Sequence, residues 1–346
     1  MSALRSWPSA IGAALAAWPR SVADGAWAVL SAALATLPDR DGAPWRRSRL
    51  GRRGFPVEFT FKGRGPGGGP AELRYTTEVD RPESAAAGRL ARAVEVADTV
   101  VGETARRSGW PADPLAELER LHADGAETLA YGAWLGARHA VSVAAGSTAP
   151  PRLKLYAELP DGRSTAAWVG AIERRWRFST WGGARPILLG IEGGRLELYY
   201  QVRAPQAHEL PTVLGRAGFG TDSAGALRNT LGRAYGLSLS RGMPAPRVGF
   251  SYGLAADPAE GVESFTLYHP ADSVFGGDAS IRRRWLELYG DGASPGAQQS
   301  YRAVSRPLEK SDCRGGSLHH GLFGVVVPRG GRAPIPALGL TPPRAA

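Results

Sequence analysis

The chain of 346 residues contains one cysteine, Cys313, which excludes an internal disulfide framework and a thiolate metal cluster. It has no run of about 18 uninterrupted apolar residues, the length that a membrane-spanning helix needs. Near the N-terminus, Pro8, Pro19, Arg20 and Asp24 interrupt the apolar core that a signal peptide requires. We therefore expect a cytoplasmic protein without a membrane span.

The motifs of several common enzyme classes are also missing. The sequence has no P-loop, no Gly-x-Gly-x-x-Gly that opens a helix after a strand, and no His-Glu-x-x-His. The adjacent His319 and His320 would face opposite sides of a strand, so they do not predict a pair of metal ligands. A bound nucleotide or zinc ion is therefore not indicated.

A formal net charge of +10 indicates an anionic partner, either nucleic acid, acidic lipid or a phosphorylated small molecule. Ten tryptophans beside this charge would also suit a nucleic-acid groove. Part of the charge is local and typical of a solvated surface or linker. It lies in two arginine runs, Arg46, Arg47, Arg49, Arg52 and Arg53, and Arg282, Arg283 and Arg284.

One strand pattern recurs at wide intervals, with leucines alternating with cations, hydroxyls and phenols. It covers residues 152–156, 195–199 and 264–268, with a shorter relative at 72–75. Side chains alternate faces along a strand, so Arg152, Lys154 and Tyr156 share one face while Leu153 and Leu155 share the other. The leucine face should be packed. Because several strands repeat the pattern, we expect the polar face to line an enclosed anion site.

The rest of the chain predicts five strand pairs separated by helices. The expected pairs are 55–62 with 71–79, 140–145 with 152–159, 187–191 with 195–203, 247–255 with 262–269, and 301–306 with 318–327. The expected helices cover 22–37, 84–107, 115–135, 164–176, 209–218, 224–235 and 278–288. A glycine-rich turn over residues 63–69 joins the first pair.

Ten antiparallel strands with helices between the pairs can close into a barrel, which removes edge strands and leaves room for a ligand. We therefore predict an α+β fold, a ten-stranded antiparallel β-barrel of five hairpin units surrounded by helices. An open sheet with one wet face is the alternative. Residues 1–50 should form a helical or partly disordered extension, residues 51–328 one barrel domain, and residues 329–346 a loose tail rich in proline and glycine.

In order and spacing, these strands resemble the ABBA-barrel aromatic prenyltransferases, most closely the dimethylallyl tryptophan synthase branch, which prenylates indoles. The similar segments are the hairpin 55–60 with 71–76, then 153–156, 194–199 and 265–270. The resemblance implies that Glu58 is the catalytic carboxylate, which accepts the acceptor's N–H and removes a proton. A surface carboxylate paired with Lys62 is the alternative for Glu58.

The resemblance also implies which residues bind the prenyl diphosphate. Fixed cations would hold the leaving diphosphate, and tyrosine ring faces would shield the allylic cation from water. The implied residues are Arg74, Lys154, Tyr156, Arg195, Tyr199, Thr266 and Tyr268. Further candidates for contacts with the diphosphate are Arg152, Arg203, Arg247 and Arg302.

Two positions depart from the family's pattern. Glu197 stands where the family has a lysine, and the fifth repeat lacks the usual tyrosine, whose place Phe323 or His320 would take. The chain also lacks Asp-Asp-x-x-Asp, through which many isoprenoid enzymes bind diphosphate with magnesium. We therefore expect no metal and no other cofactor, with prenyl diphosphate as a co-substrate.

These features predict a metal-independent prenyltransferase of secondary metabolism. It would transfer a dimethylallyl or longer group from prenyl diphosphate to an indole or tryptophan-type acceptor, free or in a peptide. A phenol-directed enzyme of the same barrel is one alternative. A non-catalytic barrel that binds anions or nucleic acid is another, and a degenerate barrel that holds an isoprenoid without turnover is a third. We expect no nucleic-acid partner, and the sequence does not indicate an oligomeric state.

Overall fold

The computed structural model describes residues 8–35, 48–51, 54–63, 72–80, 85–141, 150–237, 239, 243, 245–290, 295–311 and 318–343. Cys313, residues 64–69 and four arginines of the first run, Arg46, Arg47, Arg52 and Arg53, lie outside them. Within the described ranges, no helix combines the length and the apolar character needed to cross a bilayer.

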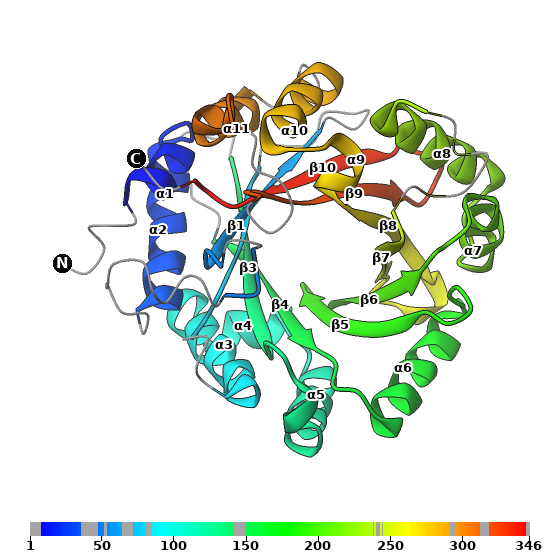
Figure 1. Cartoon of the computed structure of the whole chain (residues 1–346). Coiled ribbons are helices and arrows are strands. Elements are labelled where there is room, and N and C mark those ends of the chain that lie inside the picture. Colours follow the sequence, from blue (N-terminus) through cyan, green and yellow to red (C-terminus); the bar gives the residue numbers. More distant parts are fainter. Residues whose placement is uncertain are drawn as a thin grey trace.

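The described strands close into a ten-stranded antiparallel barrel (Figure 1). They are β1 Val57–Lys62, β2 Glu72–Thr77, β3 Ala133–Ala140, β4 Arg152–Glu158, β5 Arg185–Glu192, β6 Arg195–Arg203, β7 Arg247–Leu254, β8 Val262–Pro270, β9 His320–Pro328 and β10 Ile335–Leu340. Each strand pairs with its neighbour along the chain, and β1 pairs with β10 to complete the circle. The predicted closed barrel is confirmed, so no strand edge is left open.

Helices surround the barrel on the outside (Figure 1). They include α1 Pro8–Leu15, α2 Arg20–Leu34, α3 Ala86–Val101, α4 Glu103–Gly109, α5 Ala112–Asp124, α6 Arg163–Trp176, α7 Leu210–Arg216, α8 Thr221–Tyr235, α9 Ala271–Phe275, α10 Asp278–Trp285 and α11 Pro295–Ser305. Helix α1 packs against α11, and α2 packs against β2 and β3. The N-terminal helices therefore belong to the layer that covers the barrel.

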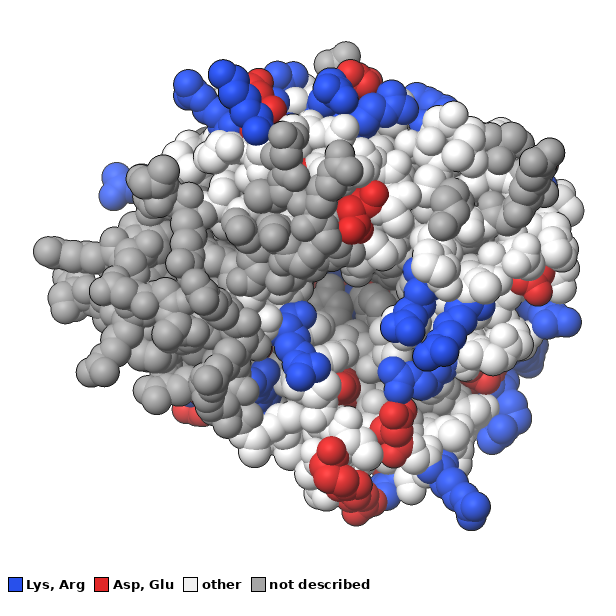
Figure 2. Space-filling view, in the orientation of Figure 1, with Lys and Arg blue, Asp and Glu red and all other residues white. Residues whose placement is uncertain are grey.

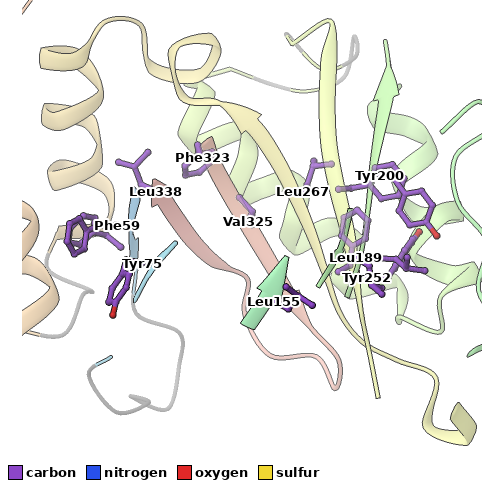
Figure 3. Close-up of a cluster of buried hydrophobic side chains, with 14 of the residues drawn as sticks. Phe59, Tyr75, Leu155, Leu189, Tyr200, Tyr252, Leu267, Phe323, Val325 and Leu338 are labelled. Atoms are coloured by element: carbon purple, nitrogen blue, oxygen red, sulfur yellow. The ribbon is translucent and has the colours of Figure 1, made fainter. Parts of the chain in front are cut away.

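The hydrophobic core lies between the outer strand faces and this helical layer. Along β6, Leu196, Leu198, Tyr200 and Val202 are buried, while Glu197 and Tyr199 between them line the barrel interior. Figure 3 shows the same core around the barrel, with Phe59, Leu155, Leu267 and Val325 among the buried side chains. Burying such a side chain contributes roughly 1.5–3 kcal/mol, so the leucine face is held outward and the polar face inward.

Tyrosine and histidine side chains also meet in this outer layer. A buried histidine on a strand shares a hydrogen bond with a tyrosine from a neighbouring strand or from a covering helix. The three pairs are Tyr75 with His139 (3.1 Å), Tyr235 with His269 (2.7 Å) and Tyr301 with His320 (3.0 Å). They satisfy polar groups that would otherwise be buried without partners.

Strand β3 lies earlier in the chain than expected. It runs from Ala133 to Ala140, whereas the expected strand covered 140–145, and the preceding helix ends at Asp124 rather than at 135. Alanine and leucine in this segment favour a helix. Pairing with β2 on one side and β4 on the other overrides that propensity.

The fifth strand pair is also shifted. Residues 301–305 lie in α11, and the barrel's last strand is β10, within the segment 329–346 that was expected to be a loose tail. The expected barrel boundary at residue 328 is therefore wrong. Phe59 pairs with Leu340 as β10 closes the barrel against β1. A proline- and glycine-rich composition hides this strand, because its pairing is decided by the rest of the barrel.

Candidate active site

The barrel encloses a cavity of about 760 Å³, to which all ten strands contribute side chains or backbone. This size lies within the range of roughly 300–1,000 Å³ that is usual for small-molecule sites. Figure 2 shows a hollow near the centre of one face, with lysine and arginine side chains beside it. The cavity is thus a candidate site for a ligand that has an anionic part.

The residues implied by the family resemblance all line this cavity: Glu58, Arg74, Lys154, Tyr156, Arg195, Tyr199, Thr266 and Tyr268. Of the further candidates, Arg152 also lines it. Arg203 and Arg247 lie exposed on paired strand ends, and Arg302 lies exposed on α11. The alternating strand pattern therefore predicted correctly which side chains face the cavity. The arginines outside that pattern lie on the surface.

Glu58 lies on β1 beside two glycines, whose lack of a side chain leaves room for its carboxylate. A Cβ atom added to Gly339 would lie 2.7 Å from its Oε1, and Gly321 on β9 leaves similar room. Glu58 and Lys62 face the same cavity without an ion pair between them, so the surface pair considered as an alternative is not formed. Burial raises the pKa of Glu58 to about 7. Such a carboxylate can accept a proton near neutral pH.

Lys154 and Glu197 form an ion pair inside the barrel. The Lys154 ammonium donates hydrogen bonds to Glu197 Oε2 and to Tyr199 Oη (3.0 Å), and Ser251 Oγ donates to Glu197 Oε1 (2.5 Å). Burial opposes ionisation of Glu197, but Lys154 and these hydrogen bonds hold its pKa at about 2. Burial would likewise lower the pKa of Lys154, and Glu197 raises it above its usual value. Both groups are therefore charged, and together they are neutral.

Three tyrosines build one wall of the cavity around this pair. The ring centroids of Tyr156 and Tyr199 lie 5.9 Å apart, and those of Tyr199 and Tyr268 lie 6.0 Å apart. Lys154 Nζ lies 4.9 Å from the Tyr156 centroid and 5.4 Å from that of Tyr199. Ring faces that already contact an ammonium group are suited to stabilise a cation.

The fifth strand pair does not supply the tyrosine that is missing from its sequence. Phe323 is fully buried on the outer face, where its ring lies 5.1 Å from that of Phe275. His320 is buried there too, and its Nδ1 donates to Asp278 (2.7 Å). Neither residue lines the cavity, so neither replaces the tyrosine. The positions that do line it from β9 include Leu322 and are not phenolic.

Arg195 lies at the open end of the cavity. Its side chain is 54% exposed, and its guanidinium lies 2.9 Å from a carboxylate oxygen of Glu263. An exposed pair of this kind contributes little to stability because water screens it. Arg195 is therefore placed to meet a ligand at the rim rather than in the depth of the barrel.

Solved structures with this architecture are available for comparison. The 5-dimethylallyl tryptophan synthase of Streptomyces coelicolor, in complex with DMASPP and Trp, aligns with 99% of this chain over 96% of its own, with a TM-score of 0.70 and 21% identity. The 6-dimethylallyltryptophan synthase of Micromonospora olivasterospora aligns with 99% over 100%, with a TM-score of 0.72 and 18% identity. The chain has the barrel fold of these prenyltransferases.

The chain is also similar to PriB in a binary complex with product diphosphate. PriB aligns with 97% of this chain over 97% of its own, with a TM-score of 0.71 and 19% identity. No protein-family model matches the sequence, and no curated protein gives a significant match. The fold that the strand motifs implied is confirmed by structure where whole-sequence comparison finds nothing.

The structure adds residues to the interior of the barrel that the sequence had not indicated. Arg138 and Trp134 line the cavity from β3, and Ser251 reaches Glu197 from β7. The β3 residues were missed because that strand was expected seven residues later. Once β3 is placed at 133–140, its alternation alone puts Trp134, Gly136 and Arg138 on the inner face. Among the described residues, no group of three or more His, Cys, Asp or Glu side chains could hold a metal ion.

Proposed function

We propose that this protein is a metal-independent aromatic prenyltransferase. It transfers a dimethylallyl or longer group from prenyl diphosphate to an indole or tryptophan-type acceptor, free or in a peptide. The observation that carries the proposal is one cavity shared by Glu58, a wall of three tyrosines and several cations. The solved structures with this fold include complexes with DMASPP and Trp, which supports the choice of substrates.

The proposed reaction begins when the allylic carbon–oxygen bond breaks and diphosphate leaves with the electron pair. Arginine and lysine side chains stabilise the charge that develops on the diphosphate. The faces of Tyr156, Tyr199 and Tyr268 stabilise the allylic cation and exclude water. A ring carbon of the acceptor then forms the new carbon–carbon bond and afterwards loses its proton to a base, the role assigned to Glu58.

In this scheme Glu58 contacts the aromatic acceptor. Its carboxylate makes no hydrogen bond or ion pair with another described residue, and its raised pKa suits exchange of a proton near pH 7. It accepts the N–H of an indole, which orients the ring and increases its electron density as the new bond forms. By the family resemblance, the phenol-directed branch of this barrel lacks the glutamate, so Glu58 favours the indole over the phenol-directed alternative.

A barrel that binds an isoprenoid without turning it over is the second candidate. One observation favours it: Glu197 neutralises Lys154, one of the cations assigned to the diphosphate. Nucleic-acid binding has less support, because in the described arginine run Arg282 pairs with Glu309 and Arg284 with Glu287 on the outer helices. We place the activity in the cytoplasm, where a chain with one cysteine needs no oxidising environment.

The test is incubation with dimethylallyl, geranyl or farnesyl diphosphate together with tryptophan, a tryptophan-containing peptide or a phenol, in the presence of a chelator. Mass spectrometry should detect a prenylated indole product. Binding of a prenyl diphosphate without any product would establish the binding-only barrel. Neither product nor binding across this panel would refute the proposed function.

A further inference from the structure

Three arginines lie directly opposite one another across neighbouring strands of the barrel. Arg74 on β2 pairs with Arg138 on β3, and Arg138 pairs in turn with Arg152 on β4. All three line the cavity, as does Lys62 on β1. Like charges in opposite positions of an antiparallel pair destabilise a sheet. Such a row therefore needs a compensating negative charge.

The described residues supply only part of that charge. Arg74 pairs with Glu72, while Arg138 (2.7 Å) and Arg152 (3.5 Å) share the single carboxylate of Glu192. The side chains of Arg74 and Arg138 are only 18% and 26% exposed, so water compensates them incompletely. Even without Lys62, these three arginines have only two carboxylates to share.

Lys62 adds to this excess. It forms no ion pair with another residue that the structure describes, and the charged groups around it are Arg74, Arg138, Glu72 and, across the cavity, Glu197. Burial together with the two arginines lowers the pKa of Lys62 to about 7. An anion that binds beside such an amine raises its pKa again, so Lys62 would be protonated in the complex. The cluster of Lys62, Arg74, Arg138 and Arg152 is hereafter the β1–β4 cation cluster.

The centre of the barrel differs from this cluster. There Lys154 is balanced by Glu197, and removing one charge from the pair would leave the other buried and uncompensated. A diphosphate placed at Lys154 would also approach the carboxylate of Glu197. The β1–β4 cation cluster differs in that its four cations share only the carboxylates of Glu72 and Glu192 among the described residues, so it keeps an excess of positive charge.

We propose that Lys62 and Arg138, together with Arg74, hold the diphosphate of the prenyl donor, and that Lys154 is not its principal ligand. This inference rests on the proposed function and assigns the anionic end of its donor to a particular part of the cavity. Arginines suit the role because a guanidinium can bind two phosphate oxygens at once. The neutral Lys154–Glu197 pair then borders the tyrosine wall.

Calorimetric titration with inorganic pyrophosphate tests the assignment on the full chain. Lys62→Met and Arg138→Gln should each weaken pyrophosphate binding about tenfold or more, since each removes a charge-assisted contact. The matched control is Arg185→Gln, a strand arginine outside the cavity that pairs with Asp161 (2.9 Å). Its affinity should stay within twofold of the original chain, and thermal melting of each variant checks that it folds.

A double substitution that leaves the net charge unchanged, Lys154→Gln with Glu197→Gln, tests whether pyrophosphate binds at the β1–β4 cation cluster or at Lys154. If the pair is neutral and peripheral to the diphosphate, the double variant should bind pyrophosphate within about threefold of the original chain. A loss of more than tenfold in the double variant, with Lys62→Met and Arg138→Gln unaffected, would overturn the inference. So would weaker tryptophan binding with unchanged pyrophosphate binding in the cluster variants, because the cluster would then hold the acceptor's carboxylate.

Measuring product formation distinguishes failure of the diphosphate assignment from failure of the proposed function. If the original chain prenylates an indole while the cluster variants bind pyrophosphate normally, the assignment of the diphosphate site fails and the function stands. If the original chain neither binds pyrophosphate nor forms product, both fail.

Discussion

Glu197 accepts a hydrogen bond from Lys154 inside the barrel, and the two side chains form a neutral pair at a place where family resemblance implies two cations. Glu197 therefore has two effects on the charge of the cavity. It replaces the lysine that the resemblance implies, and it neutralises the charge of Lys154. The pair lies among Tyr156, Tyr199 and Ser251, which together contact both partners. The pair separates Lys154, whose charge is balanced by Glu197, from the β1–β4 cation cluster, whose charge is only partly balanced.

The first prediction concerns Glu197→Gln. Without the carboxylate, Lys154 is left as a buried charge, which should cost about 3 kcal/mol of folding free energy. Added pyrophosphate should restore much of that loss and bind about tenfold more tightly than to the original chain, because the cavity then carries one more net positive charge. Chemical denaturation with and without pyrophosphate measures both effects.

The matched control for this substitution is Glu117→Gln on α5, which removes one of the two carboxylate partners of the exposed Arg120. It should change the free energy of unfolding by less than about 1 kcal/mol, since water screens such pairs. If Glu197→Gln changed the free energy of unfolding as little as this control and left pyrophosphate binding unchanged, the Lys154–Glu197 pair would matter neither for stability nor for anion binding.

The second prediction concerns the pH dependence of Glu58. A base must be deprotonated to act, and burial raises the pKa of Glu58 to about 7. At saturating prenyl diphosphate, the rate of indole prenylation should therefore rise as pH increases through 7. Glu58→Gln should lower the rate by roughly 10²–10⁴ and abolish this rise. A Glu58→Gln variant that kept the same pH profile would exclude Glu58 as the group responsible.

The third prediction uses the glycine beside that carboxylate. A methyl group at Gly339 would lie 2.7 Å from Glu58 Oε1, so Gly339→Ala should push the carboxylate out of place. Turnover should fall at least tenfold, while pyrophosphate binding at the β1–β4 cation cluster stays within about twofold. Gly220→Ala is the control, because a methyl group there meets no other atom within 4 Å. Equal activity in the two variants would contradict the placement of Glu58.

The fourth prediction concerns stability in acid. Burial lowers the pKa of His139 and of His269 to about 4, and it lowers that of His320 as well. An unfolded histidine titrates near pH 6.5, so the unfolded chain binds more protons between about pH 6.5 and 4. Stability should be complete above this window and fall through it, by up to about 3 kcal/mol for His139 and for His269.

Denaturant unfolding at pH 7 and at pH 5 measures this loss. Replacing a buried histidine, as in His269→Gln, should reduce the difference between the two pH values. His208→Gln should leave it unchanged, because His208 is exposed. A difference that persisted undiminished in His269→Gln would show that other groups cause the acid sensitivity.

Most of the inner wall could be predicted from the sequence, because strand alternation is a local property. Lys154 and Tyr156 must share a face wherever β4 lies, and the leucines between them must face the core. Arg138 could not be predicted in the same way. Its segment favours a helix by composition, and only hydrogen bonding to β2 and β4 makes it a strand. The closing strand β10 was hidden for the same reason.

The sequence by itself determined the first, third and fourth hairpin units, the polar inner face and the tyrosines, since these depend on residues close together in the chain. Only the tertiary structure decided what the charges do. Lys154 and Glu197 are 43 positions apart and meet because their strands lie on one closed barrel. The raised pKa of Glu58 and the excess charge of the β1–β4 cation cluster arise likewise from burial and distance, which no local pattern records.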